Sequence, residues 1–219
     1  MNYNLQFGAV WASFDSLLSG LAIGLGLAIA AVAIGTALGL LSAFASVSKL
    51  WPLRAVSGVY VSLIRNIPLL VLVLLVYFAL PETGIRLSKY ESFIASLALY
   101  SGAYLTEVFR AGLLSVPKGV IEAARAIGLT RLQTNISVVT PIMIRNALPS
   151  LGNTFISMFK DSSIAAAIAI PELTFEARKI NVDTFRVVET WSVASGLYIA
   201  TCFAIAFLLR QLERRFPKF

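Results

Sequence analysis

Histidine is absent from the 219 residues of this chain, and cysteine occurs once, at Cys202. Histidine-based metal sites and histidine general bases are therefore excluded, and so is an internal disulfide. Charged residues are scarce as well, at 13% of the sequence, whereas about 25% is usual for a soluble domain. Hydrophobic residues make up 58% of the sequence, and the mean hydropathy is +0.83. This composition indicates one membrane domain over residues 1–219, with most of its length in lipid.

The chain also lacks a G-x-x-x-x-G-K-[ST] phosphate-binding loop around any lysine, so it cannot bind ATP by that device. No lysine or arginine occurs between Met1 and Trp11, which argues against a cleaved secretory signal. The net charge is +7, yet the basic residues gather at the ends of apolar blocks, as topology determinants do. Nucleic-acid binding is therefore a poor interpretation of the charge. We expect no catalytic site, cofactor or metal ion in this chain.

Five apolar blocks predict an all-α integral membrane protein with about five transmembrane helices. The spans are expected at about residues 17–44, 56–80, 92–114, 142–159 and 191–209. Gly20 with Gly24, and Gly35 with Gly39, have a spacing that lets helices approach closely. Close packing inside one subunit is preferred here to a dedicated dimer seam. Pro68 predicts a kink or break in the second span.

Charges in the connections predict the topology of the chain. The first connection, the loop at Lys118 and the C-terminal tail hold ten bases against two acids, whereas the connections at Pro81 and Pro171 hold five against six. Because bases accumulate in cytoplasmic loops, the C-terminus is placed in the cytoplasm and the N-terminus outside. The first group comprises Lys49, Arg54, Lys118, Arg125, Arg131, Arg145, Arg210, Arg214, Arg215 and Lys218, with Glu122 and Glu213; the second comprises Arg86, Lys89, Arg178, Lys179 and Arg186, with Glu82, Glu91, Glu172, Glu176, Asp183 and Glu189.

The loop from Lys118 to Pro141 is the longest polar segment between two apolar blocks on the basic side of the chain. Its first half predicts a short helix, opened by Pro117 and Gly119 and ended by Gly128 in the left-handed conformation. Glu122 is placed in the first turn, where the helix dipole favours an acid. Such a helix is too short to span a bilayer but small enough to sit in another protein's groove. Three alanines would give it a low-relief face: Ala123, Ala124 and Ala126.

This loop carries a resemblance to a known family. Glu122-Ala123-Ala124, followed by Gly128 and Pro141, resembles the EAA loop in the membrane subunits of binding-protein-dependent ABC importers. Three flanking segments are similar to the polar amino acid branch of that family: Tyr60–Leu70, Tyr104–Gly119 and Phe159–Ile164. The resemblance covers Tyr60 to about Ile180, and the rest agrees only in hydropathy. Three loop positions depart from the usual pattern while keeping shape or β-branching: Val120, Val138 and Thr140.

The resemblance implies a type I ABC importer permease fold in the bacterial inner membrane. The chain would be a permease subunit, not an enzyme, that moves polar amino acids by alternating access. Its partners would be an ABC ATPase dimer that holds ATP and magnesium, a second permease subunit (this chain or a relative), and an extracytoplasmic solute-binding protein. The loop would be the coupling helix that rests on the ATPase, through Gly119, Glu122, Ala123, Ala124, Arg125 and Gly128.

Two other interpretations belong to different functional classes. A self-sufficient channel or an ion-coupled secondary carrier for small solutes is the alternative, and a partner ATPase would distinguish it. A membrane anchor is a third. The charges within or beside the apolar spans argue against an anchor, which would not need them: Arg65, Glu107 and Asp161.

Polar groups inside the third predicted span are candidates for a substrate path, because such groups are costly in lipid. Ser101, Tyr104 and Glu107 fall on one broad helical face and could line a cavity for an amino acid's ammonium group. Alternatively, Glu107 forms a structural pair with Arg110, three residues on.

Two further groups border backbone interruptions. Arg65 and Asn66 precede the proline of the second span and could meet a substrate carboxylate, or Arg65 could snorkel or bond carbonyls freed at the break. Lys160, Asp161 and Ser162 follow the fourth span and could shape a gate or the substrate cavity, or simply stop a helix at the outer interface. A half-helix that returns into the protein is one interpretation of this segment.

Overall fold

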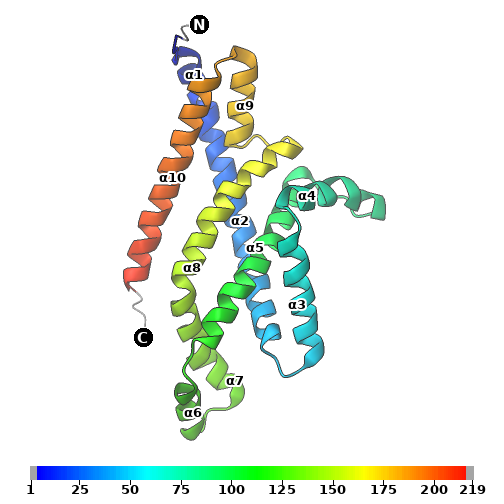
Figure 1. The fold of residues 1–219 in the computed structure, drawn as a ribbon, viewed down its shortest axis with the longest axis vertical. Coiled ribbons are helices and arrows are strands. Elements are labelled where there is room, and N and C mark those ends of the chain that lie inside the picture. Colours follow the sequence, from blue (N-terminus) through cyan, green and yellow to red (C-terminus); the bar gives the residue numbers. More distant parts are fainter. Residues whose placement is uncertain (1–3, 216–219) are drawn as a thin grey trace. The chain divides into compact units, whose positions relative to one another are not determined.

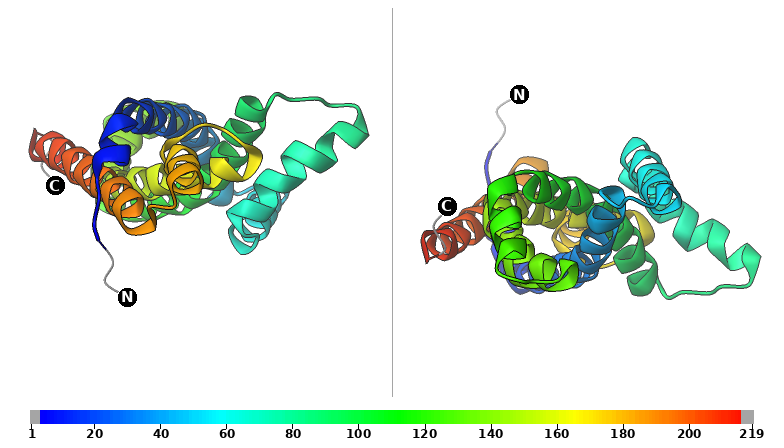
Figure 2. Two further views of the ribbon diagram at one scale, coloured as in Figure 1. Left: turned by 90° about the horizontal axis from the view of Figure 1, so that it is seen from above. Right: turned by 90° about the horizontal axis from the view of Figure 1, so that it is seen from below.

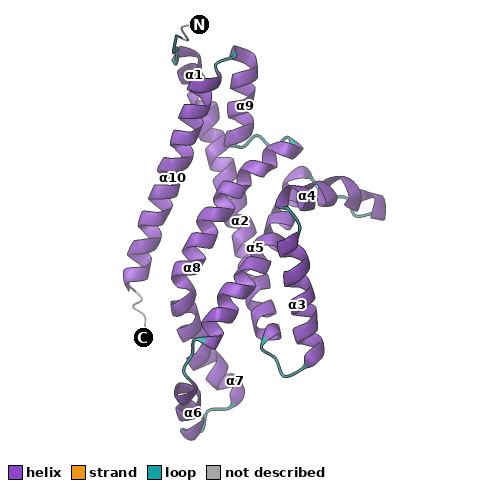
Figure 3. Cartoon of the chain, viewed as in Figure 1, coloured by secondary structure: helices purple, strands orange, loops and turns teal. Residues whose placement is uncertain are grey.

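Helices form nearly all of the computed structural model, which describes residues 4–215, and no strand occurs in that range (Figure 1; Figure 3). The α-helices are α1 (Gly8–Ala12), α2 (Phe14–Ser46), α3 (Trp51–Asn66), α4 (Leu69–Leu74), α5 (Lys89–Leu114), α6 (Lys118–Ala126), α7 (Arg131–Thr134), α8 (Thr140–Asp161), α9 (Leu173–Thr184) and α10 (Val187–Arg215). Two π-helical stretches, η1 (Leu75–Ala79) and η3 (Asn135–Val139), and two 3-10 stretches, η2 (Leu80–Thr83) and η4 (Ser162–Ile168), continue them. The prediction of an all-helical fold is confirmed.

Two of these helices, α2 and α10, are long and apolar enough to cross a membrane. A third crossing results if α3 and the segment Leu69–Thr83 together form one broken span. With 33 residues, α2 is about 50 Å long, against about 30 Å of hydrocarbon in a bilayer. The predicted third and fourth spans coincide with α5 and α8, and their passage through the membrane stays a prediction.

The predicted interruption at Pro68 is present. Helix α3 ends at Asn66 and α4 begins at Leu69, and Pro68 between them is extended, with φ −57° and ψ 134°. Proline lacks the N–H that a continuing helix would need, and its ring disfavours helical conformation in the preceding residue. The break therefore follows from the local sequence alone.

The chain divides into two compact units by its contacts. Within the described residues, the first holds the segments up to Ala33, Ile67–Ala98 and Phe155–Ile205, and the second holds Ile34–Asn66, Leu99–Thr154 and the chain from Ala206 onward. Each unit is assembled from three segments that are separate in the sequence. The boundaries of the units could therefore not be predicted from local composition. Lys218, counted above among the cytoplasmic charges, lies outside the described residues.

In the first unit, a buried cluster joins α1, the start of α2, α9 and the start of α10, which are seen together from above in Figure 2. Its buried members are Val10, Leu17, Leu173, Ala177, Ile180 and Ala194. At Gly20 the approach is closest, since a Cβ there would lie 2.8 Å from the carbonyl carbon of Glu172. The absence of a side chain thus lets α2 pack directly on the backbone at the start of α9, inside one chain, as expected.

Two acids that the sequence places in outer connections are buried in this unit. Glu172 caps α9 by accepting the N–H groups of Thr174 and Phe175, both at 2.9 Å, and it accepts the hydroxyl of Tyr198 at 3.0 Å. Burial raises the pKa of the Glu172 carboxyl, although these hydrogen bonds act in the opposite direction. Glu189 is also fully buried and accepts the backbone N–H of Gln6 at 2.8 Å. Acidic residues contribute little to the orientation of a membrane protein, which depends mainly on lysine and arginine. The predicted orientation therefore does not depend on these two acids.

In the second unit, α2 and α5 approach closely through small residues. A Cβ on Gly39 would lie 2.8 Å from the Cβ of Leu105 and 3.1 Å from the carbonyl oxygen of Gly102. Farther along α5, a Cβ on Gly112 would lie 2.9 Å from the carbonyl oxygen of Met143 in α8. Between the ends of α5 and α8, the chain forms α6, α7 and η3, shown from below in Figure 2.

Candidate functional site

The short helix predicted in the loop at Lys118 is present as α6, directly after Pro117. Pro117 is the N-cap, with φ −62° and ψ 135°, so the helix begins at Lys118. Glu122 therefore lies in the second turn, and the prediction that it lies in the first turn is wrong. Of the two residues expected to open the helix, Pro117 does so as its N-cap, whereas Gly119 is already the second helical residue and Glu122 is the fifth.

The end of α6 at Gly128 is as predicted. Gly128 has φ +91°, and its N–H bonds the carbonyl oxygen of Arg125 at 3.0 Å. The N–H of Leu129 bonds the carbonyl oxygen of Ala124 at 3.2 Å. These two bonds form a Schellman motif, which needs a left-handed residue at this position and therefore favours glycine.

The exposed surface of α6 differs from the expected alanine face. Ala124 is buried against its own chain, with 5% of its surface exposed, so it cannot share a free face with Ala123 and Ala126. Glu122 is exposed and forms no ion pair within the described part of the chain. Ile127, at the C-cap, is 80% exposed and so presents an apolar side chain at the end of the helix.

The second unit also brings candidate substrate residues together. The guanidinium carbon of Arg65 in α3 lies 5.0 Å from the ring centroid of Tyr104 in α5, a cation–π contact. The hydroxyls of Tyr104 and Tyr100 lie 3.2 Å apart. Arg65 is exposed and forms no ion pair with any described residue, although its charge also acts at longer range on the Glu107 carboxylate.

Glu107 pairs with Arg110 on its own helix. The Nε of Arg110 donates to both Glu107 carboxylate oxygens at 3.2 Å, and its Nη2 donates to Oε2 as well. The structural pair considered from the sequence is therefore formed. The two side chains stay 32% and 40% exposed, so the pair is open to solvent or to a solute.

Two other candidates have structural partners. Ser101 is fully buried within the helix packing and does not reach a free surface of the chain. Asn66 donates its side-chain amide to the carbonyl oxygen of Ser62 at 2.7 Å, which satisfies an acceptor at the end of α3. Of the candidates in this unit, the arginine of α3 and the aromatic and acidic residues of α5 thus remain accessible.

The first unit carries Lys160, Asp161 and Ser162, where α8 ends, as the interpretation of a helix stop predicted. Helix α8 continues through Asp161 and tightens directly into the 3-10 stretch η4. Ser162 is buried and donates its hydroxyl to the carbonyl oxygen of Phe159 at 2.7 Å. After η4, Ala169 takes a left-handed φ of 54°, and its carbonyl oxygen accepts the ammonium of Lys89 at 2.7 Å.

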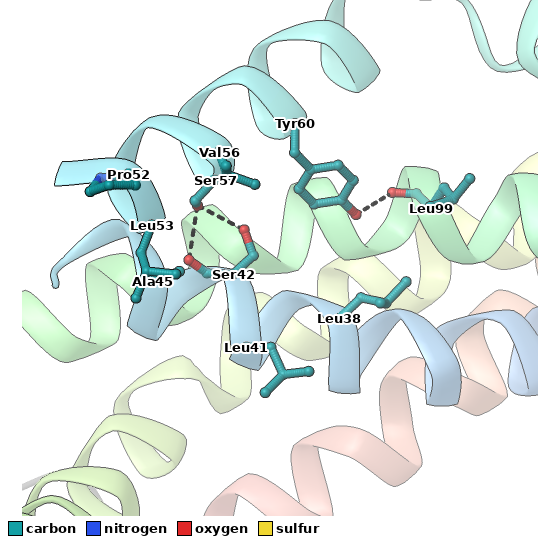
Figure 4. Close-up of a pocket in the computed structure, with 10 residues that line it drawn as sticks. All are labelled: Leu38, Leu41, Ser42, Ala45, Pro52, Leu53, Val56, Ser57, Tyr60 and Leu99. Atoms are coloured by element: carbon teal, nitrogen blue, oxygen red, sulfur yellow. Dashed lines mark hydrogen bonds between the residues drawn. The ribbon is translucent and has the colours of Figure 1, made fainter. Parts of the chain in front are cut away.

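An apolar pocket of about 540 Å³ in the second unit offers no anchor for a zwitterion (Figure 4). Its polar groups already bond one another: Ser57 donates to the carbonyl oxygen of Ser42 at 2.9 Å, and Tyr60 donates to that of Leu99 at 2.7 Å. A solute amino acid needs partners for its ammonium and its carboxylate. This pocket therefore does not replace the Arg65 and Tyr104 region as the candidate substrate site.

Residues 35–218 match the family described as the binding-protein-dependent transport system inner membrane component. The chain belongs to this family. It is therefore a permease subunit of an ABC transporter, located in the inner membrane. Both the family resemblance and the permease assignment drawn from the EAA-like loop are confirmed.

The similarity to the relatives covers nearly the whole permease. The glutamine transport system permease protein GlnP of Escherichia coli (strain K12) is 35% identical over 96% of this chain and 97% of that protein. The L-cystine permease TcyB of Bacillus subtilis (strain 168) is 37% identical over 98% and 93%, respectively. A crystal structure of an amino acid ABC transporter with histidines is 35% identical, with a TM-score of 0.89 over 97% of this chain and all of that chain. The MetNI methionine transporter, at 18% identity and a TM-score of 0.74, supports the type I fold alone.

The loop between α5 and α8 contains a second short helix, α7, that the sequence interpretation missed. Thr130 Oγ1 accepts the N–H of Gln133 at 3.3 Å, and Gln133 Oε1 accepts the N–H of Thr130 at 2.9 Å. This is a capping box, and its T-x-x-Q signature was present in the sequence. Ile127 and Tyr100 were missed as well. An apolar residue directly before Gly128 was the signal for Ile127. A tyrosine one helical turn before Tyr104 was the signal for Tyr100.

Proposed function

We propose that this permease moves polar amino acids inward as the membrane subunit of an ATP-driven importer. The observation that carries the substrate class is similarity over nearly the full chain to permeases named for glutamine and L-cystine. The exposed cation of Arg65, which lies over the ring of Tyr104, fits this class. A guanidinium binds a carboxylate through two parallel hydrogen bonds, and every amino acid carries one.

The proposed partners are a dimer of ABC ATPases that holds ATP and magnesium, an extracytoplasmic solute-binding protein and a second permease. The second permease is either another copy or a relative. Bacillus subtilis (strain 168) has two relatives named as probable glutamine permeases, GlnM and GlnP, at 33% and 37% identity. Two such proteins in one organism are compatible with a mixed pair.

Helix α6 is the proposed contact with the ATPase. Glu122 offers an unpaired charge, and Ile127, at the C-cap of the same helix, offers an exposed apolar side chain. An interface has an apolar core and a polar rim, so both kinds of side chain could take part in such a contact. Movement of the ATPase dimer would reach the membrane helices through this contact.

The substrate path is proposed to include Arg65, Tyr104 and Glu107 of the second unit. Arg65 would bind the carboxylate of the solute. Glu107 would attract the ammonium, in competition with Arg110. Lys160, Asp161 and Ser162 of the first unit are proposed as a second part of the path, since they border the change from α8 to η4.

Uptake by the reconstituted transporter, screened against all twenty amino acids, tests the substrate class. Arg65→Gln removes a charge-assisted bond and should weaken apparent affinity about 10- to 150-fold, as expected for about 1.5–3 kcal/mol. Arg54→Gln, an exposed cation on the same helix, is the matched control and should import at the parental rate. Glu107→Gln and Asp161→Asn should also lower uptake while the complex still assembles.

Parental uptake by all three charge variants would place the substrate site elsewhere. Degradation of Glu107→Gln and Asp161→Asn would instead assign those charges a structural role. Uptake that continues without ATP hydrolysis would favour the alternative of a channel or an ion-coupled carrier.

A further inference from the structure

A second pocket in the second unit, of about 440 Å³, lies among α6, α7, η3 and the C-terminal ends of α2 and α5. Its volume is within the range of small-molecule sites, about 300–1,000 Å³. Its lining is divided by chemistry. Four polar side chains, those of Lys49, Arg125, Arg131 and Asn135, share it with apolar residues from the helix ends.

All the charges that line this pocket are positive. Lys49 follows α2, Arg125 lies in the last turn of α6, and Arg131 begins α7, so three separate segments supply them. No acid is among the lining residues, and no side chain among the described residues forms an ion pair or hydrogen bond with these three. Three neighbouring cations without counter-ions repel one another, and an anion among them would relieve that repulsion.

The apolar part of the lining favours an anion that also carries an apolar group. Val47, just after α2, and Leu114, at the end of α5, are 43% and 66% exposed, and Phe44 lies beside them in the lining. A free inorganic phosphate would leave these walls without partners. A phospholipid has a charged phosphate and an apolar body joined in one molecule, so it uses both parts of the lining.

The position in the chain fits the same occupant. Helix α2 is long and apolar enough to span the membrane and ends at Ser46, and Lys49 follows three residues later. Basic residues that closely follow an apolar span accumulate on the cytoplasmic side, where they can meet anionic headgroups. Basic pockets between membrane helices on the cytoplasmic side are suited to anionic headgroups.

We propose that this pocket binds an anionic phospholipid, with its phosphate among Lys49, Arg125 and Arg131 and its glycerol and first methylenes on the wall around Phe44. Ile121 and Arg125 belong to α6, so the bound lipid touches the proposed coupling helix directly. The lipid composition of the membrane thereby acts on the position of α6. The binding itself does not depend on whether α6 docks on an ATPase.

The test uses the full chain in neutral detergent and short-chain phosphatidylglycerol as the probe. Native mass spectrometry measures the lipid retained and its apparent affinity. Phosphatidylcholine of the same chain length is the uncharged comparison, and glycerol 3-phosphate is the soluble anion without an apolar body. The variant is Lys49→Gln with Arg131→Gln, and the matched control removes two exposed cations outside the pocket, Arg54→Gln with Lys118→Gln.

We expect phosphatidylglycerol to bind in preference to both comparison compounds. Removal of each cation should weaken its binding about fivefold, so the double variant should lose about 25-fold, and the control pair should change it less than twofold. Thermal unfolding without added lipid checks that both proteins fold. If the double variant does not fold, each single variant should still show the fivefold loss.

Three results would overturn the proposal. Equal weakening in the control pair would mean that the lipid responds to general surface charge. Displacement of the lipid by glycerol 3-phosphate at equal concentration would make this a site for free anions. Unchanged lipid binding in the double variant, with loss of ATPase co-purification, would assign the pocket to an acidic segment of the protein partner.

Discussion

Gly128→Val tests whether α6 couples the permease to its ATPase. Valine at a φ of +91° costs about 1–3 kcal/mol, because its branched Cβ clashes with the backbone in left-handed conformations. The loop can escape this strain only by abandoning the Schellman bonds of Gly128 and Leu129, which are worth about 0.5–1.5 kcal/mol each. Either route therefore destabilises the end of α6 by about 1–3 kcal/mol, which is about one to two powers of ten in its population.

The cost should stay local, since nothing lies within 4 Å of a Cβ at this position. Gly128→Asn provides a graded step, because asparagine tolerates the left-handed region better than valine does. Gly58→Ala is the matched control: it also has open space, but it lies inside α3 and needs no unusual backbone.

The assay is substrate-stimulated ATP hydrolysis by the transporter in liposomes, together with ATPase pull-down and thermal unfolding of the permease. Stimulation should fall in the order glycine, asparagine, valine, while the unfolding temperature changes little and the control behaves as the parent. Parental stimulation in Gly128→Val would refute the coupling role. A large fall in unfolding temperature would refute the view that this loop is separate from the membrane core.

Three further predictions concern packing, pH and topology. Gly39→Ala places a methyl group 2.8 Å from the Cβ of Leu105 and should lower the unfolding temperature by about 2–12 °C. Gly26→Ala is the control, because it has open space around it and should leave the unfolding temperature unchanged. Equal unfolding temperatures in the two variants would contradict the close packing of α2 on α5. Burial raises the pKa of the Glu172 carboxyl, so its contribution to stability is fully present below the ordinary pKa of about 4.3 and is lost as pH rises through the raised pKa. Glu172→Gln should remove this pH dependence from the unfolding temperature. An identical pH profile in the variant would contradict the prediction. Single cysteines are placed at Asn2 and Lys218, both outside the described residues, in a Cys202→Ala background. An impermeant thiol reagent applied to spheroplasts should label the cysteine at position 2 but not the one at position 218. The reverse pattern would invert the predicted topology.

Features that depend on local backbone chemistry were predictable from the sequence. Pro68 cannot continue a helix, and Gly128 suits a left-handed helix end, so both interruptions were expected at the right residues. The capping box at Thr130 and Gln133 is equally local, and its signature could have been read. The turn occupied by Glu122 was predicted wrongly because the helix start depends on the conformation of one proline.

Features that depend on distant partners were not predictable. Glu172 was interpreted as an outer loop charge, and only the position of Tyr198 and the packing of Gly20 reveal that it is a buried cap. The sequence nominated Arg65 and Tyr104 separately, but it could not place one over the other. Burial of Ala124 likewise depends on how α6 lies against the rest of its unit.

The ion pair of Glu107 and Arg110 has a consequence for an alternating-access cycle. Both residues belong to α5, so the counter-ion travels with the charge whenever that helix moves as a rigid rod. The contact of Arg65 with Tyr104 joins two helices instead, and a displacement of α3 against α5 must stretch or release it. Such a contact is worth about 0.5–2 kcal/mol, a size that thermal motion and a bound solute can both supply. The ion pair within α5 is thus unchanged by such a displacement, whereas the contact between α3 and α5 changes with it.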